Sequence, residues 1–520
     1  MELNKKSVQM LQTKSEAVNQ ITFDEDFNVP DSKPDIRRMI QKKGEIRLDE
    51  VQVSEEKALI HGSLYFRLLY VADTPQKKIC SLEGSLPVNE TLHLKDLKSG
   101  DKVCLKWEIE DLTLHIINSR KLNIKAIVEF KASVDELQKV ELPLSVRQEE
   151  SLSEKKRTIQ ILTLAVHKKD TLRRKEEITL ASNKPNIHEV LWSEIEARGM
   201  DLRAEEGKVQ VKGELFVFVL YAGDDDTNPI QWLEQAVPFV GEVSCSGCTM
   251  DMVPYIQTTV LQNSLEIQPD ADGEERILQI EIVLELDMKV FREESESILT
   301  DVYTPHMECI PGKKEVVLEQ LLVKNNAKCR VNDRIPVQEA QGKILQICHS
   351  EGSIKTDSAV RTEQGIRIEG VIQIRILYSI SDDEMPFYSM ETSIPFSHLL
   401  EAQGMDSRSA FYLQTDLEQL STIMLDSSEI EVKAVINLNA LVLRRWKEEL
   451  ITDIQEKELD PQKLEQMPGI VCYLAQSGDT LWDVAKRFYT TTDSICELNE
   501  LEEEELRPQQ ALLIVKKTER

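Results

Sequence analysis

The cysteines and histidines are the side chains of this sequence best suited to redox or metal chemistry. Cys245 and Cys248 form the one C-x-x-C pair among nine cysteines, a spacing used by zinc sites and thioredoxin-like redox centres. A zinc site needs a second pair or two histidines at ligand spacing, and a redox centre needs a βαβ context; the sequence shows neither. An odd number of cysteines scattered along the chain predicts reduced thiols, and we interpret the segment from Cys245 to Cys248 as an inert turn.

A recurring tyrosine and glutamate could suggest acid–base catalysis. They follow a glycine by eight and 21 residues in the sets Gly62, Tyr70 and Glu83; Gly213, Tyr221 and Glu234; and Gly370, Tyr378 and Glu391. The residue before the glycine is His61, Lys212 or Glu369, so no acid–base pair or metal cluster recurs with them. Nucleotide-binding, serine-hydrolase and zinc-protease motifs are missing from the sequence. We therefore predict no catalytic residues, no metal and no cofactor, with the tyrosine at a strand end and the glutamate in a loop making local hydrogen bonds.

The same spacing indicates three tandem copies of one domain. The glycine strands are 58–70, 209–221 and 366–378, and each glycine is followed by a proline 25 residues later. Segments 122–130, 278–286 and 430–438 alternate apolar and polar residues, which predicts a second strand in each copy. The offsets of 151 and 157 residues suit a domain of about 150 residues. We expect a mainly β protein with repeats at 1–150, 151–300 and 301–450.

Two local signals refine this expectation. The mid-strand glycine predicts a bulge or a close backbone approach. Pro34 and Pro185, each preceded by polar residues, predict the first position of a short helix, with Ile36 and Met39 on its apolar face in the first copy. In the third copy the equivalent position is Gly342 and the proline motif is lost.

Net charge argues against several partners. A formal net charge of −29 disfavours nucleic acid and anionic membranes unless a basic patch is segregated, and the sequence shows no such patch. The N-terminal segment lacks the apolar core of a signal peptide, and no run reaches the roughly 18 apolar residues of a membrane span. These observations predict a globular, cytoplasmic protein with no direct membrane insertion.

The C-terminal residues predict a small βααβ module. Asp479 or Thr480 is placed to cap a helix after a glycine turn. The apolar stripe of that helix is Leu481, Val484, Ala485 and Phe488. A second short helix through Ile495 ends near Asn499, and 512–515 returns as a strand.

This module resembles a LysM domain from about Val471 to Lys516. The resemblance implies recognition and no chemistry. The chain departs from the family where LysM modules usually read Pro-Gly-Gln, because it has Pro508-Gln509-Gln510, and an acidic run at 502–505 lies just ahead. We place the LysM domain at 470–517 and a charged linker at 451–469, which predicts flexible attachment.

One face of the first LysM helix is a candidate partner-binding surface. Trp482 lies about 100° from Leu481, in line with Lys486 and Tyr489. An aromatic residue off the buried stripe suits an interface anchor. Alternatively, Trp482 folds over the second helix as core. We expect Ile470 to extend the surface, so the predicted partner-binding set is Ile470, Trp482, Lys486 and Tyr489.

The whole chain resembles a known family. Val29-Pro-Asp-Ser-Lys-Pro-Asp-Ile36, within three tandem β-rich copies, resembles the SPOCS domain of sporulation and spore-coat proteins. SPOCS copies ending in one LysM domain are similar to SipL-type coat morphogenetic proteins, which are functionally similar to SpoVID. The resemblance implies a mother-cell protein at the forespore surface, a non-enzymatic scaffold that works with other coat proteins. It also implies that the LysM domain binds the coat-basement ATPase, SpoIVA or a similar protein.

Two alternatives stay open. A peptidoglycan-binding wall or cortex protein would hold N-acetylglucosamine chains through two LysM loops, at Gly478, Asp479, Thr480, Leu481, Leu501 and Pro508. The missing signal peptide, Gln509 and the acidic run disfavour this function. In the second alternative the LysM module is a stable cap without a partner. The sequence physics leaves the ligand of the three repeats and the oligomeric state open.

Overall fold

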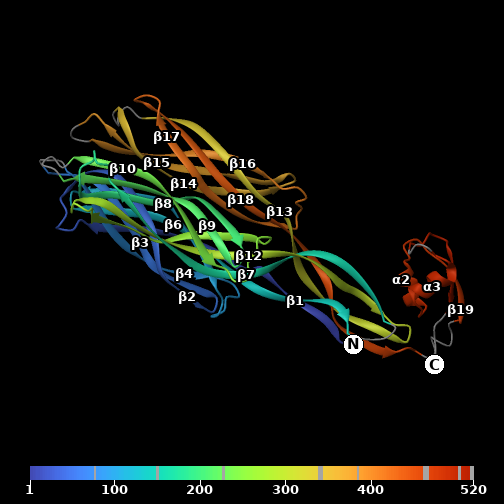
Figure 1. Cartoon of the computed structure of the whole chain (residues 1–520). Coiled ribbons are helices and arrows are strands. Elements are labelled where there is room, and N and C mark those ends of the chain that lie inside the picture. Colours follow the sequence, from blue (N-terminus) through green and yellow to red (C-terminus); the bar gives the residue numbers. More distant parts are fainter. Residues whose placement is uncertain are drawn as a thin grey trace.

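The computed structural model describes residues 1–74, 78–147, 152–224, 229–337, 343–382, 386–460, 468–501 and 505–515. Long antiparallel strands form an elongated body, and a small domain with the two labelled helices lies at one end (Figure 1). This confirms the predicted mainly β fold. No helix of the described residues is long and apolar enough to cross a membrane.

Each of the three copies contains six strands in the same order. Those of copy 1 are β1 (Leu3–Asn28), β2 (Ile36–Ser54), β3 (Lys57–Ala72), β4 (Ile79–His93), β5 (Val103–Asn118) and β6 (Lys121–Val146). Those of copy 2 are β7 (Ser153–Thr179), β8 (Ile187–Glu205), β9 (Lys208–Gly223), β10 (Ile230–Ser244), β11 (Val253–Pro269) and β12 (Glu275–Tyr303). Those of copy 3 are β13 (Met307–Pro336), β14 (Ile344–Thr362), β15 (Gly365–Ile380), β16 (Phe387–Glu401), β17 (Ser409–Met424) and β18 (Glu429–Glu458).

The six strands of a copy form two three-stranded antiparallel sheets. In copy 1 the strand orders are β1-β6-β5 and β2-β3-β4, and copies 2 and 3 repeat them. Phe66 on the glycine strand and Phe130 on the alternating strand are buried in one core between the two sheets. The alternating patterns therefore mark the inner faces of a sandwich, as expected.

The first and last strands of each copy are much longer than the usual three to ten residues. β1 has 26 residues and pairs with β6 along its length, and β18 has 30. Near the end that carries the small domain, these long strands pack together in a core that draws on all three copies. Its buried residues are Val8, Met10, Val140, Leu142, Ile159, Ile161, Ile298, Leu318 and Leu450. The copies therefore form one body.

Equivalent positions of the three copies meet within this body. Another shared core contains Leu69 of copy 1, Leu220 of copy 2 and Leu377 of copy 3. Lys43 forms ion pairs with Glu194 and Glu351, which occupy the same position in the other two copies. The three copies thus surround a common axis, like the subunits of a trimer within one chain.

The mid-strand glycines mark both a close approach and a bulge, as predicted. A Cβ on Gly62 would overlap the backbone oxygen of Arg47, and a Cβ on Gly370 would overlap that of Lys355. Opposite Gly62 the pairing of β2 shifts between Leu48 and Glu50. The glycine lets the bulged neighbouring strand pass close to the backbone.

The helices predicted after Pro34 and Pro185 are wrong, because both segments are strands. β2 contains two register shifts close together, between Ile36 and Arg38 and between Met39 and Gln41. Each bulge adds a residue, so the inward positions are three and four residues apart and imitate a helical spacing. The shifts recur in β8 and β14. Gly342, the equivalent of these prolines in copy 3, lies outside the described residues.

The recurring tyrosines and glutamates are structural. Tyr70 donates its hydroxyl to the Pro34 carbonyl at 3.0 Å, and Tyr221 repeats the bond to Pro185 at 3.3 Å. The local role is confirmed for these two tyrosines, whereas Glu234 lies 2.9 Å from a ring nitrogen of His349 in copy 3. The predicted loop position of the glutamates is wrong, since they lie on β4, β10 and β16. Glu391, for example, accepts a hydrogen bond from Arg375 at 3.1 Å.

Two further expectations need correction. β18 continues to Glu458 with Ile451 and Ile454 buried, so residues 451–458 are strand and not linker; 461–467 lie outside the described residues. Cys245 and Cys248 form a disulfide bond within a buried turn, so the prediction of reduced thiols fails for this pair. Their Cα atoms are 5.6 Å apart, which suits a disulfide.

Candidate functional site

The small C-terminal domain has the predicted βααβ order. Its elements are β19 (Ile470–Leu474), α2 (Leu481–Arg487), α3 (Thr492–Asn499) and β20 (Ala511–Val515). Leu481, Val484 and Ala485 of α2 are buried in one core with residues of α3 and β20, as the apolar stripe predicted. Asn499 joins α3 to β20, since its side chain donates to the Leu513 carbonyl and accepts from the Leu513 N–H.

Turn chemistry sets the start of α2. The Thr480 hydroxyl oxygen accepts a hydrogen bond from the Asp483 N–H at 3.2 Å, so Thr480 is the cap of the two candidates. Asp479 instead accepts from the Tyr473 hydroxyl at 2.6 Å and from the Gln476 N–H at 2.9 Å. These bonds hold the pKa of Asp479 below its usual value.

Trp482 and Lys486 contact the body of the molecule at the end of β12. The Trp482 indole N–H donates to Asp301 at 2.8 Å, and the Lys486 ammonium lies 2.7 and 2.8 Å from the two carboxylate oxygens. The Trp482 ring meets Tyr303 edge to face, with centroids 4.7 Å apart. Two side chains of α2 therefore bind one carboxylate of copy 2.

Asp301 is adapted to this contact. Burial would raise the pKa of its carboxyl group, but the hydrogen bonds from Lys486 and Trp482 lower the pKa below its usual value. The carboxylate is therefore charged at neutral pH. Sequence reasoning missed Asp301 because nothing in the chain marks a single aspartate on a long strand as the partner of a helix 181 residues away.

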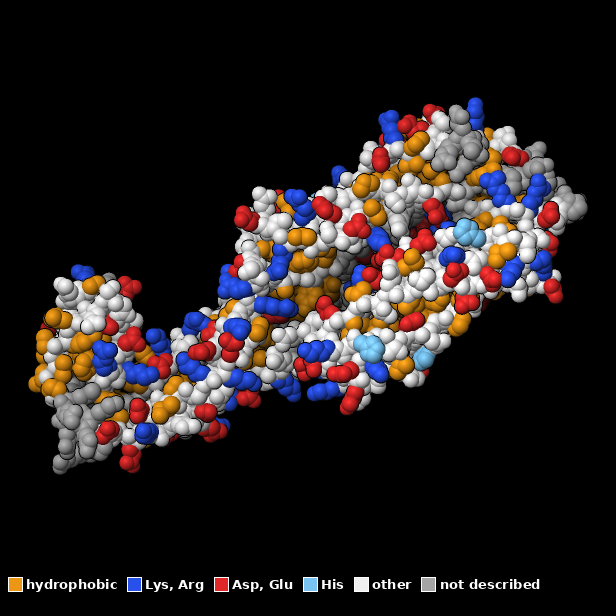
Figure 2. Space-filling model, turned by 180° about the vertical axis from the view of Figure 1, so that it is seen from behind, with side chains coloured by type: hydrophobic (Ala, Val, Ile, Leu, Met, Phe, Trp, Pro, Cys, Tyr) orange, Lys and Arg blue, Asp and Glu red, His pale blue; other side chains and the backbone are white. Residues whose placement is uncertain are grey.

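The other two residues of the predicted partner-binding set lie elsewhere in the domain. Ile470 is 65% exposed and lies on the outer face of the β19–β20 ribbon, whereas Tyr489 is half-buried just after α2. Apolar side chains of both strands share that outer face with Ile470; the large exposed ones are Leu474, Leu513 and Val515. Figure 2 shows hydrophobic side chains gathered on this domain, at the left end of the view.

The residues of the alternative glycan site are mostly engaged within the domain. Leu481 is buried, and Asp479 and Thr480 make the bonds described above. Gly478 and Pro508 are exposed, and Leu501 is half-buried. Of the acidic run, residues 502–504 lie outside the described part of the chain.

A second candidate site is a cavity of about 1370 Å³ between copies 2 and 3. Strands β7, β13, β14, β17 and β18 and the turn before β17 line it. Its side chains include Arg157, Arg361, Arg408, Arg445, Lys447 and Trp446. Arg445 and Lys447 belong to the short basic segment Arg444-Arg445-Trp446-Lys447, and folding brings Arg157, Arg361 and Arg408 next to it.

A buried charge cluster lies where the three copies meet. Carboxylate oxygens of Glu194, Glu196 and Glu351 lie within 4.8 Å of one another, a spacing compatible with a metal ion. Lys43 pairs with Glu194 and Glu351, and three arginines pair with the same cluster, so protein cations already neutralise it; these are Arg67 with Glu194, Arg198 with Glu196 and Arg375 with Glu351. We interpret the cluster as structural.

Together the fold and the two sites define a class of protein. It is a binding protein, in which tandem β-sandwich copies carry a small recognition domain. The SipL, SPOCS domain family matches residues 35–117, 186–268 and 343–425, and the LysM domain family matches residues 473–515. The chain therefore contains three SPOCS domains of the SipL family, followed by a LysM domain. No curated protein and no solved structure matches the chain.

Each SPOCS match covers the same four strands of its copy. In copy 1 residues 35–117 span β2 to β5, and the long strands β1 and β6 lie almost entirely outside. SPOCS and LysM are binding domains, and the family is one of spore-coat morphogenesis.

Proposed function

We propose that this protein is a non-enzymatic scaffold of endospore coat assembly that binds a SpoIVA-like coat-basement ATPase through its LysM domain. The observation that supports the proposal is the combination of three SPOCS domains with one LysM domain. The protein would act in the mother-cell cytoplasm, at the forespore surface, together with other coat proteins.

Trp482 and Lys486 are the residues that we assign to partner binding. An indole N–H and an ammonium group that converge on one carboxylate form a receptor for an acidic side chain. In the free protein Asp301 fills that receptor. The partner therefore offers a carboxylate of its own and displaces Asp301 when it binds.

Ile470 supplies a separate contact in this proposal. It belongs to the outer face of the β19–β20 ribbon, while α2 packs on the inner face, where Val471 and Leu512 point into the domain core. A partner that touches both Ile470 and Trp482 must reach around the edge of the ribbon.

Binding to an N-acetylglucosamine polymer has less support. Leu481 is 3% exposed, so it offers no surface to a sugar. The side chains of Asp479 and Thr480 already make hydrogen bonds within the domain.

Co-purification tests the proposal. The full chain, tagged and expressed in sporulating cells, should retain the coat-basement ATPase, and Trp482→Glu should lose it by at least tenfold while circular dichroism stays unchanged. Gln257→Glu on β11, which adds the same charge at a distance from the small domain, is the matched control. Retention of the ATPase by a folded Trp482→Glu variant would remove Trp482 from the site. Failure of the wild-type chain to retain the ATPase would reject the proposed partner.

A further inference from the structure

Five cations line the cavity between copies 2 and 3. Three of them are neutralised by ion pairs, namely Arg157 with Glu448, Arg445 with Glu319 and Lys447 with Glu315. Arg408 and Arg444 share the single carboxylate of Asp406, at 2.8 and 3.0 Å. Arg361 donates to the backbone carbonyls of Ser407 and Ser409 and, among the described residues, to no carboxylate. At the Arg361 end of the cavity, three guanidinium groups therefore face one carboxylate, and positive charge is in excess.

Three of the cations at this site, Arg361, Arg408 and Arg445, are specific to copy 3. At the positions of Arg361, Arg408 and Arg445, copy 2 has Ala204, Asp251 and Glu293, and copy 1 has Val53, Gly100 and Leu137. Copies 1 and 2 form the same sandwich without these cations. The fold therefore does not require them, which points to a role in binding.

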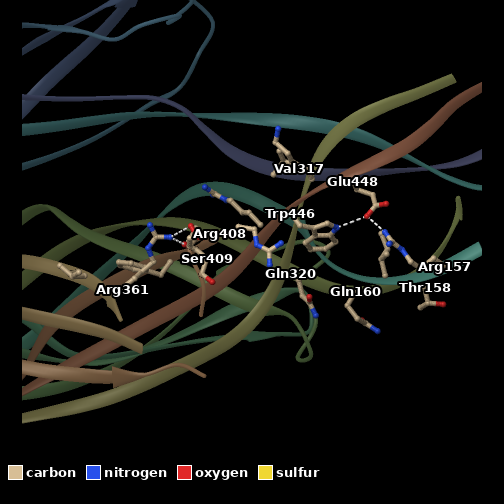
Figure 3. A pocket seen from close by; sticks show the side chains of 18 residues that line it. Arg157, Thr158, Gln160, Val317, Gln320, Arg361, Arg408, Ser409, Trp446 and Glu448 are labelled. Carbon is tan, nitrogen blue, oxygen red and sulfur yellow. Dashed lines mark hydrogen bonds and ion pairs between the residues drawn. The ribbon is translucent and has the colours of Figure 1, made fainter. Parts of the chain in front are cut away.

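Apolar surface lies at the other end of the cavity. Figure 3 shows Arg361, Arg408 and Ser409 toward one end and Trp446, Glu448 and Arg157 toward the other. The Trp446 indole N–H donates to Glu448 at 3.2 Å, and Glu448 also pairs with Arg157, so the indole is held in place. Phe411 and the exposed Val360 add apolar lining.

The size of the cavity helps to define its occupant. The cavity is wide open to solvent and has a volume of about 1370 Å³, so an extended peptide segment can lie along it, whereas a metabolite needs a more enclosed site. The net charge of −29 repels a long polyanion such as nucleic acid, whereas a short acidic segment carries few charges.

We propose that this cavity binds an acidic peptide segment of another protein. Its carboxylates face Arg361 and Arg408, and one of its apolar side chains packs on Trp446. Arginine forms bidentate bonds with carboxylates, and its planar group suits this contact better than lysine does. The site belongs to the SPOCS copies and is independent of the partner of the LysM domain.

A synthetic peptide tests the site on the full chain. The probe is a labelled acetyl-Glu-Glu-Leu-Glu-Glu-Leu-Glu amide, and binding is followed by fluorescence anisotropy. Wild-type protein should bind this probe, and the affinity should fall several-fold when the ionic strength rises from about 0.05 to about 0.3 M, because salt screens exposed charges. The same peptide with glutamine at every glutamate should not bind.

Matched variants assign binding to the cavity. Arg361→Gln with Arg408→Gln should weaken the acidic peptide at least tenfold. Arg173→Gln with Lys175→Gln changes the charge equally on β7, outside the cavity, and should leave affinity within twofold. If the double variant does not fold, the single variant Arg408→Gln replaces it, because the Arg408 side chain is 57% exposed and its loss should not disturb folding.

The proposal would be overturned if the glutamine peptide bound as tightly as the acidic peptide, or if the control variant on β7 lost as much affinity as the cavity variant. Unchanged affinity in folded Arg408→Gln and in the folded double variant would also overturn it. Competition by inorganic tripolyphosphate as strong as that by unlabelled acidic peptide would show a general anion site and would also reject it.

Discussion

Trp482 donates its indole N–H to the Asp301 carboxylate at 2.8 Å, although the two residues are 181 positions apart in the chain. Lys486 binds the same carboxylate from the next turn of the helix. One aspartate of copy 2 therefore holds the helix that we assign to partner binding. The LysM domain thus presents a free receptor only when this contact opens.

Asp301→Ala should release the LysM domain from the body. Hydrogen bonds to charged groups contribute about 1.5 to 3 kcal/mol each, so their loss should shift the domain largely to the open form. Hydroxyl-radical footprinting should show higher reactivity of Trp482 and Tyr303, and partner affinity should rise about tenfold or more. Asp251→Ala, an exposed aspartate away from the small domain, is the control. Unchanged footprints would show that Asp301 does not hold the domain.

The contact between Trp482 and Asp301 should depend on pH in one direction. The hydrogen bonds lower the pKa of Asp301 below its usual 3.8 in the docked state. A depressed carboxyl pKa adds stability above the undocked pKa, and this stability is lost as the pH falls through the docked value. Footprints of Trp482 should therefore be constant from pH 7 to about pH 5 and rise below about pH 4. In Asp301→Asn this acid step should disappear, and its persistence would assign it to another group.

The strand glycines offer a graded test of packing. Gly62→Ala forces a Cβ onto the rigid backbone of Arg47, whereas Gly213→Ala meets the flexible Met200 sulfur at 2.6 Å. We expect losses in the free energy of unfolding of about 3 kcal/mol for the first and about 1 kcal/mol for the second. Gly100→Ala has open space around it and should be nearly neutral. Urea unfolding measures the series, and equal losses at Gly62 and Gly100 would contradict the close approach.

Sequence patterns predicted much of this fold. The tyrosine, glutamate and proline that follow Gly62, Gly213 and Gly370 at constant distances reflect equal strand and loop lengths, so the three copies could be counted from the sequence. The β-bulges of β2 could not be seen, because two bulges give Ile36 and Met39 the spacing of a helix. Periodicity records which residues are buried and not how the backbone reaches them.

The contacts between domains could not be predicted from the sequence, for a different reason. Trp482 was singled out because it lies off the buried stripe, but its acceptor, Asp301, depends on how the LysM domain packs on β12. The cations of the cavity come from separate strands, so no window of sequence contains more than a few of them. Local patterns predict elements, whereas these sites arise from the packing of complete domains.

Lys43 should stabilise the association of the three copies. Burial would lower its pKa, but Glu194 and Glu351 raise it, and the pKa of Glu351 falls to about 2. Lys43→Gln leaves Glu194 and Glu351 with Arg67 and Arg375 as their cationic partners and should cost about 3 kcal/mol at pH 8. Without Lys43 the pKa of the buried Glu351 carboxyl rises, so the loss should shrink toward pH 5 as this carboxyl gains a proton.

Urea midpoints at pH 5 and pH 8 measure this difference. Lys175→Gln breaks an exposed ion pair with Glu281 and serves as the control, with an expected cost below about 1 kcal/mol at both pH values. A Lys43→Gln variant as stable as this control would show that the charge cluster contributes nothing to the association of the copies.

Gln509 is under backbone strain that a glycine would remove. Its φ of +65° lies in the left-handed region, at the position where LysM modules usually carry glycine. Because a side chain costs about 1 kcal/mol in that conformation, Gln509→Gly should stabilise the LysM domain by about that amount. The neighbouring Gln510, whose φ is not positive and whose side chain accepts a hydrogen bond from the Arg507 N–H, supplies the control, since Gln510→Gly should destabilise the domain. Hydrogen exchange at the amides of β20 measures both changes in the full chain. Faster exchange in Gln509→Gly would show that the strain at this turn is relieved elsewhere in the domain.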